Sequence, residues 1–120
     1  MRVDKADLFE DISQSMDSWV EAVSDALIKP EADLAWVEDR DLYRKLQNEL
    51  CISRVNGESI RRVLAECLRG FAVSFFATID GDTALGEKGR VHLVDEDGRN
   101  LGESLHDDFV GYLMDSGRLQ

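Results

Sequence analysis

The sequence predicts an α+β fold that is predominantly α-helical: a helical bundle of about four to five helices with one β-hairpin inserted before the last helix. Two observations carry this prediction. Apolar residues recur at helical spacing over most of the chain, and one alternating segment with turn residues follows the longest such stretch. The length of 120 residues and the hydrophobic fraction of 43% fit a single domain over residues 1–120 with a core of its own.

The first helix is expected from about Asp4 to Ile28. Its apolar positions step by three or four residues and therefore share one face: Leu8, Ile12, Met16, Trp19, Val23 and Leu27. Lys29-Pro30 ends it, because the residue before a proline disfavours helix. Pro30 can open a short second helix. Asp39 or Asp41 can cap a third helix that runs to about Cys51.

A long central helix is expected from about Glu58 to Ala77. Its apolar positions again step by three or four residues: Ile60, Leu64, Cys67, Phe71, Phe75 and Ile79. The alternative is that Gly70 breaks this helix and that residues 71–79 form a strand, because phenylalanine, valine and isoleucine favour strands. The continuous helix is the preferred interpretation.

A β-hairpin is expected after the central helix. Arg90–Val94 alternates between polar and apolar residues, as a strand does, and Asp95–Gly98 contains residues typical of turns. Arg99–Leu101 would form the second strand. This arrangement would place Val91 and Leu93 inward. Ser104 is followed three residues later by Asp107, in the manner of a capping box. A last helix is therefore expected from Leu105 to about Asp115.

The charge balance narrows the possible partners. Twenty-five acidic residues oppose fourteen basic ones, for a formal net charge of −11. This charge disfavours nucleic acid and anionic membranes and suits a basic protein partner. No apolar run is long enough to cross a membrane, and the start does not resemble a signal peptide. Cys51 and Cys67 are expected to be buried free thiols, which indicates a cytoplasmic protein. A homodimer is also compatible with a helix-rich domain of this size.

Catalytic, cofactor-binding and metal-binding residues are not expected, and the chain is not expected to be an enzyme. It has no nucleophile elbow, phosphate-binding loop, dinucleotide fingerprint or paired cysteine motif. His92 and His106 could hold a metal or exchange protons only if the hairpin folds against the last helix. Asp80 and Asp82 alone are too few ligands for a cation. The aromatic residues have core-like spacing, with Trp36 the least securely buried and a candidate for an interface.

Three pieces of the segment from Thr78 to Arg118 carry a resemblance: Ile79-Asp80-Gly81, Val94-Asp95-Glu96-Asp97-Gly98, and Leu105-His106-Asp107-Asp108-Phe109. The segment resembles small acidic bacterial domains of unknown function, some of which accompany toxin systems as immunity-like proteins. The resemblance implies a bacterial cytosolic protein and assigns no functional residue.

The chain is therefore expected to be a non-enzymatic protein-binding module of the immunity or antitoxin kind. The alternative is a domain that binds a small molecule or a divalent cation in a pocket between the central helix and the hairpin. The expected partner-binding residues form an acidic rim in the second half of the chain: Asp80, Asp82, Asp95, Glu96, Asp97, Asp107 and Asp108.

Overall fold

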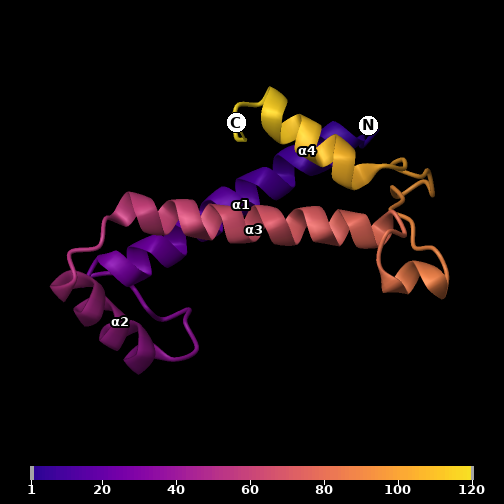
Figure 1. Cartoon of the computed structure of the whole chain (residues 1–120). Helices are drawn as coiled ribbons and strands as arrows, with labels where there is room; N and C mark the ends of the chain where they lie inside the picture. Colours follow the sequence, from indigo (N-terminus) through magenta and orange to yellow (C-terminus); the bar gives the residue numbers. More distant parts are fainter. Residues whose placement is uncertain (1, 120) are drawn as a thin grey trace. The chain divides into compact units, whose positions relative to one another are not determined.

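A computed structural model describes residues 2–119, and all the regular structure in this range is helical (Figure 1). The α-helices are α1 (Lys5–Ile28), α2 (Arg40–Ile52), α3 (Gly57–Ile79) and α4 (Leu105–Asp115), with a short 3-10 helix η1 (Ala84–Glu87). The predominance of helix is confirmed. The α+β class is wrong, because the described residues contain no strand, and the fold is all-α.

The expected hairpin is reduced to a turn with one isolated antiparallel bridge, between Val94 and Asn100. Two backbone hydrogen bonds cross the turn, from the Asp95 N–H to the Arg99 carbonyl and from the Leu101 N–H to the Leu93 carbonyl. The chain then leaves the extended conformation at Gly102, whose φ is +115°. Val91, expected inward, is 44% exposed. The alternating pattern is present, but no neighbouring strand pairs with it, and a lone hairpin is marginal in water.

The long helices follow the sequence pattern closely. α3 continues through Gly70, so the strand alternative for residues 71–79 is wrong. α2 begins after Asp39, whose carboxylate accepts the Leu42 N–H at 3.0 Å, as a helix cap does. The short helix expected at Pro30 does not form, and turns occupy that segment. No helix in the described part of the chain is long and apolar enough to span a membrane.

The chain divides into two compact units, which are described separately. The first comprises Met1–Gln14 and Leu68–Gln120, and the second comprises Ser15–Cys67. The helices α1 and α3 are each divided between the units, with one segment in the first unit and the other in the second.

Three phenylalanines form the centre of the first unit. Phe9 of α1, Phe76 of α3 and Phe109 of α4 are each at most 3% exposed. Their ring centroids lie 5.0–5.3 Å apart, and the rings are tilted or edge-on to one another, as aromatic quadrupoles favour. Leu105 and Leu113 bury the same face of α4. α4 therefore belongs to this core through a full apolar stripe.

The second unit is held by polar contacts around few buried apolar residues. The buried Gln47 side chain of α2 donates to the carbonyl of Ala26 at 2.6 Å and to that of Lys29 at 3.3 Å. These carbonyls lie at the end of α1, where backbone acceptors lack helical partners. Arg61 of α3 pairs with Glu21 and Asp25 of α1 at 3.5 and 3.6 Å. Gln47 thus joins α2 to the end of α1, and Arg61 joins α3 to α1.

The phenylalanine cluster predicts a strong asymmetry between two substitutions of the same residue type. Phe109→Ala, at a site with no exposure, should lower the free energy of unfolding by about 3–5 kcal/mol. Phe71→Ala, at a site that is 72% exposed, should change it by no more than about 0.5 kcal/mol. Urea denaturation followed by circular dichroism measures both, and equal losses would contradict the assignment of the core.

Candidate functional site

The carboxylate of Asp80 caps helix α4 from the end of α3. Its Oδ1 accepts the backbone N–H of Leu105 at 2.9 Å, and its Oδ2 accepts that of His106 at 2.9 Å. Only 6% of the side chain is exposed. A helix N-terminus has unpaired N–H groups and a partial positive charge, and both favour a carboxylate. Asp80 therefore replaces the local cap that a helix start usually carries.

Ser104 does not cap α4, and the expected capping box is absent. Its φ is +57°, a left-handed conformation, and its side chain makes no capping hydrogen bond. The cap instead comes from Asp80, twenty-five positions before Leu105 in the chain. Sequence reasoning missed this arrangement because capping motifs are recognised from local spacing.

The backbone around Asp80 depends on two glycines. Gly81 has a φ of +82°, which a side chain rarely permits, and this conformation ends α3. Gly86 lies against it, and a Cβ on Gly86 would come within 2.2 Å of the Gly81 carbonyl oxygen. The tight loop therefore turns the chain sharply just after Asp80.

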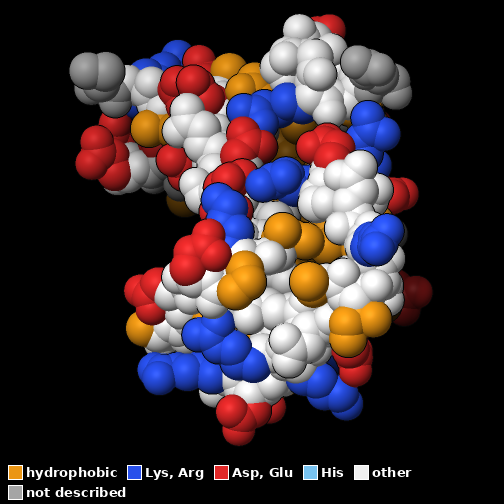
Figure 2. Space-filling model, turned by 90° about the vertical axis from the view of Figure 1, so that its left-hand side faces the viewer, with side chains coloured by type: hydrophobic (Ala, Val, Ile, Leu, Met, Phe, Trp, Pro, Cys, Tyr) orange, Lys and Arg blue, Asp and Glu red, His pale blue; other side chains and the backbone are white. Residues whose placement is uncertain are grey.

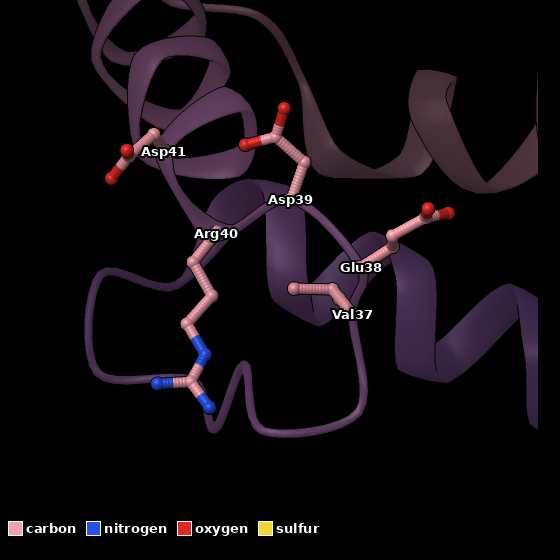
Figure 3. A pocket seen from close by; sticks show the side chains of 5 residues that line it. All are labelled: Val37, Glu38, Asp39, Arg40 and Asp41. Carbon is pink, nitrogen blue, oxygen red and sulfur yellow. The ribbon is translucent and has the colours of Figure 1, made fainter.

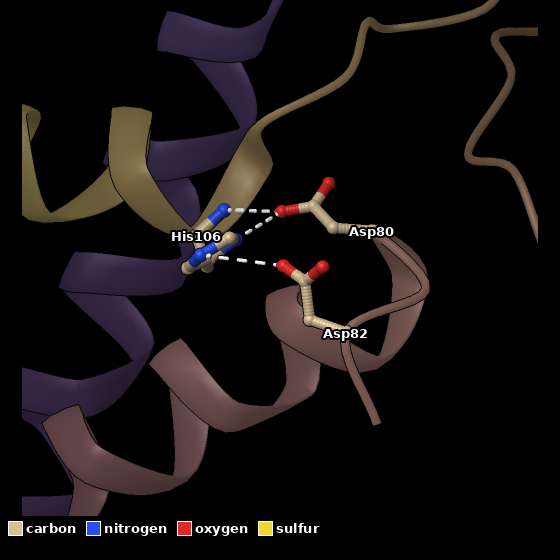
Figure 4. Close-up of side chains that lie close together, drawn as sticks. All are labelled: Asp80, Asp82 and His106. Atoms are coloured by element: carbon tan, nitrogen blue, oxygen red, sulfur yellow. Dashed lines mark hydrogen bonds and ion pairs between the residues drawn. The ribbon is translucent and has the colours of Figure 1, made fainter. Parts of the chain in front are cut away.

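The imidazole of His106 lies among three carboxylates, two of which are drawn in Figure 4. Nδ1 contacts Asp80 Oδ2, while Nε2 lies 3.4 Å from Asp82 Oδ2 and 3.5 Å from Asp107 Oδ1. The hydrogen bond with Asp80 raises the pKa of His106, partial burial opposes it, and the charges of Asp107, Asp80 and Asp82 raise it further. The fold thus stabilises the protonated imidazolium relative to the neutral ring.

The pKa of Asp80 shifts in the opposite direction. Burial alone would raise it, but hydrogen bonds from the His106 side chain and from the two backbone N–H groups together lower it. Asp80 and His106 therefore stabilise each other's charged forms. We call this pair, with the two backbone N–H groups, the Asp80 clamp.

The turn at residues 95–99 is a separate acidic site whose charge is largely compensated. Asp95, with a side chain only 3% exposed, accepts from the N–H groups of Asp97 and Arg99 at 2.9 Å and from Arg99 Nε at 3.0 Å. Asp97 pairs with Arg99 Nη2 at 3.2 Å. The hydrogen bond from the Arg99 backbone N–H lowers the pKa of Asp95, and burial opposes this shift. The Asp97 N–H and the charge of Arg99 lower the pKa further. Asp95 therefore builds the turn.

The expected acidic rim is smaller than the sequence suggested. Asp80, Asp82 and Asp107 gather around His106, while Asp108 pairs with Lys5 of α1. More than half of the side chain is exposed in Asp82, Asp97 and Asp107, and Glu96 is also an exposed residue. Much of the rim has a structural role in caps, turns and ion pairs.

Asp80, Asp82 and His106 could each offer one ligand atom to a metal ion, within 4.8 Å of one another. Both oxygens of Asp80 already accept backbone N–H groups, however, and a metal would need His106 deprotonated. His92 contacts Asn100 at 3.1 Å instead of joining this group. The arrangement is better explained as a charged clamp than as a metal centre.

The second unit contains a cluster of aromatic residues, whose spacing in the sequence predicted a place in the core. Trp19 of α1 is 55% exposed and Trp36 is 45% exposed. Their ring centroids lie 5.9 Å apart, and Trp36 lies 6.3 Å from Tyr43 of α2. The expectation that Trp36 is poorly buried is confirmed. Its position between acidic residues is the signal that could have marked this cluster as a surface.

Both cysteines are free and exposed, so the expectation of buried thiols is wrong. Cys51 lies on α2 and Cys67 on α3, each at an apolar position of the sequence that the fold leaves uncovered.

Comparisons with known protein families, curated proteins and solved structures find no match. The resemblance of Thr78–Arg118 to immunity-like domains therefore stays a prediction.

The Asp80 clamp predicts a matched pair of substitutions. Asp80→Ala should lower the free energy of unfolding by about 2 kcal/mol, because it removes a helix cap and leaves partly buried N–H groups unpaired. Asp82→Ala, whose side chain is 55% exposed, should cost no more than about 0.5 kcal/mol. Urea denaturation compares them, and similar losses would argue against the clamp.

The clamp also predicts how stability depends on pH. Because the pKa of folded His106 is raised, its contribution is fully present below its ordinary value of 6.5 and is lost as the pH rises through the folded pKa. Because the pKa of folded Asp80 is lowered, its contribution is present above 3.8 and is lost as the pH falls through the folded pKa. Urea midpoints should therefore fall as the pH rises above about 6.5 and through the folded pKa of His106. His106→Gln should remove most of this fall in the urea midpoint, and the control His92→Gln should not. An unchanged fall in His106→Gln would show that His106 is not the titrating group.

Proposed function

We propose that the chain is a non-catalytic protein-binding module whose partner is basic. The observation that supports this most strongly is the distribution of apolar side chains. Among residues 2–119, thirteen large hydrophobic side chains are exposed, whereas nine hydrophobic residues are buried. Hydrophobic side chains are visible between charged ones on the face in Figure 2. Isolated exposed hydrophobic residues are common, but contiguous ones mark interaction sites.

The net negative charge of the chain supports a partner of positive charge. The net charge of −11 repels other anions and speeds encounter with a cationic surface. A basic protein partner fits this charge, and nucleic acid and anionic membranes do not. We further propose that the module is of the immunity or antitoxin kind and that it is cytoplasmic. Two exposed free thiols favour a reducing compartment.

The alternative proposal is a divalent-cation site at Asp80, Asp82 and His106, which three adjacent ligand atoms support. It is the weaker proposal, because Asp80 and His106 already neutralise each other in the clamp. Nothing else in the described residues supplies a nucleophile paired with a base, so catalysis is not part of the proposal.

The proposal predicts a strong salt dependence of binding. The immobilised chain should capture a basic protein from its source cells at low salt. The association rate of that purified partner should fall by about tenfold or more between low and high salt in surface plasmon resonance. An uncharged solute added in place of the salt should leave the association rate unchanged.

Two outcomes would contradict the proposal. One is a captured partner whose association rate ignores salt. The other is a chain that binds no protein while Zn²⁺, Mg²⁺ or Ca²⁺ raises its melting temperature in proportion to affinity, which would favour the cation site.

A further inference from the structure

The aromatic cluster of the second unit presents two tryptophans to solvent. We define the aromatic patch as Trp19, Trp36 and Tyr43. The indole rings of Trp19 and Trp36 meet edge to face, with 75° between their planes, and each residue keeps about half of its surface exposed. Tryptophan, tyrosine and arginine dominate the residues that contribute most energy to protein interfaces. A pair of half-exposed tryptophans is therefore a candidate anchor point for a partner.

The loop that carries Trp36 is held in place. Leu34 is 4% exposed and anchors its centre. Arg44 of α2 donates to the Pro30 carbonyl at 2.7 Å, and the Asp33 carboxylate accepts the Ala35 N–H at 2.8 Å. The Val37 N–H bonds to the Leu34 carbonyl at 3.2 Å. Because these contacts order the loop before binding, little conformational entropy is lost when a partner contacts Trp36.

The loop that carries Trp36 is rich in acidic residues. Residues 30–39 contain four acidic side chains and no basic one: Glu31, Asp33, Glu38 and Asp39. The adjoining depression is lined by Val37–Asp41. In Figure 3 the side chain of Arg40 extends away from the carboxylate of Asp39. Glu38 and Asp41 are exposed, so their charges face solvent.

We propose that the aromatic patch binds an arginine-bearing basic segment of a partner protein, an inference that rests on the proposed function and names its surface. A guanidinium stacks on the face of tryptophan and is attracted by the ring quadrupole. The same group forms two parallel hydrogen bonds with a carboxylate, which lysine cannot do. The exposed indoles, with the exposed carboxylate of Glu38 two residues after Trp36, supply both kinds of group. A second copy of this chain would bring the same acids together, and like charges oppose that pairing.

The chain contains a built-in reporter for this surface. Its two tryptophans both belong to the patch, so intrinsic tryptophan fluorescence reads this site alone. The probe is a short peptide of alternating arginine and glycine, compared with the peptide in which lysine replaces arginine. Calorimetry at low salt measures the total binding of each peptide. The arginine peptide should shift the emission saturably and bind about threefold or more tighter than the lysine peptide.

Matched variants locate the binding. Trp36→Leu should weaken the arginine peptide by about tenfold, with Trp19 still reporting. Phe71→Leu, which changes an exposed aromatic residue of the other unit, should stay within about twofold. Glu38→Gln should weaken binding by about threefold, whereas Glu10→Gln, which changes an exposed acid of α1 in the other unit, should stay within about twofold. Within the described residues, neither Glu38 nor Glu10 has a side-chain hydrogen bond or ion pair to lose, so this comparison does not depend on folding of the tryptophan variant.

Three results would overturn the inference. Calorimetric binding without an emission change, with Trp36→Leu unaffected, would place the basic segment elsewhere and leave the proposed function standing. Emission that shifts with protein concentration in the absence of peptide would assign the patch to a second copy. A chain that binds neither peptide at low salt would reject both the patch and the basic partner.

Discussion

The Asp80 clamp is the interaction on which the arrangement of the first unit depends. α4 is only eleven residues long, and an isolated helix of that length is marginal in water. It follows a long segment in which η1 and one β-bridge are the only regular structure. Its buried stripe packs on Phe9 and Phe76, but apolar contacts alone tolerate rotation and sliding of a helix. Two directional hydrogen bonds from Asp80 fix where the helix begins.

The clamp also changes how the acidity of the chain is understood. His106 stands in the first turn of α4, where a positive charge opposes the helix dipole. Asp80, Asp82 and Asp107 offset that cost by surrounding the imidazole. Asp95 and Asp97 similarly surround Arg99, and Asp108 faces Lys5. Asp80, Asp95, Asp97 and Asp108 therefore stabilise loops and helix ends of this unit.

The sequence predicted the long helices well and the hairpin badly, for one physical reason. Helical periodicity over twenty residues is a local signal, so the bounds of α1, α3 and α4 agree with expectation to within about two residues. Strand pairing needs partners that local alternation does not guarantee, and Val91 and Val94 stay exposed. The Asp80 cap links residues far apart in sequence, so no local motif could reveal it. Trp19 fits the α1 apolar stripe by spacing, yet it lies at the edge where the fold leaves it uncovered.

The most direct test of the clamp is an NMR titration of the His106 ring in the intact chain. The clamp predicts a pKa above the ordinary 6.5, because the Asp80 carboxylate holds the proton on the imidazole. In Asp80→Asn the pKa should fall, since the amide keeps the shape but loses the charge. A pKa at or below 6.5 in the native chain, unmoved by Asp80→Asn, would contradict the clamp.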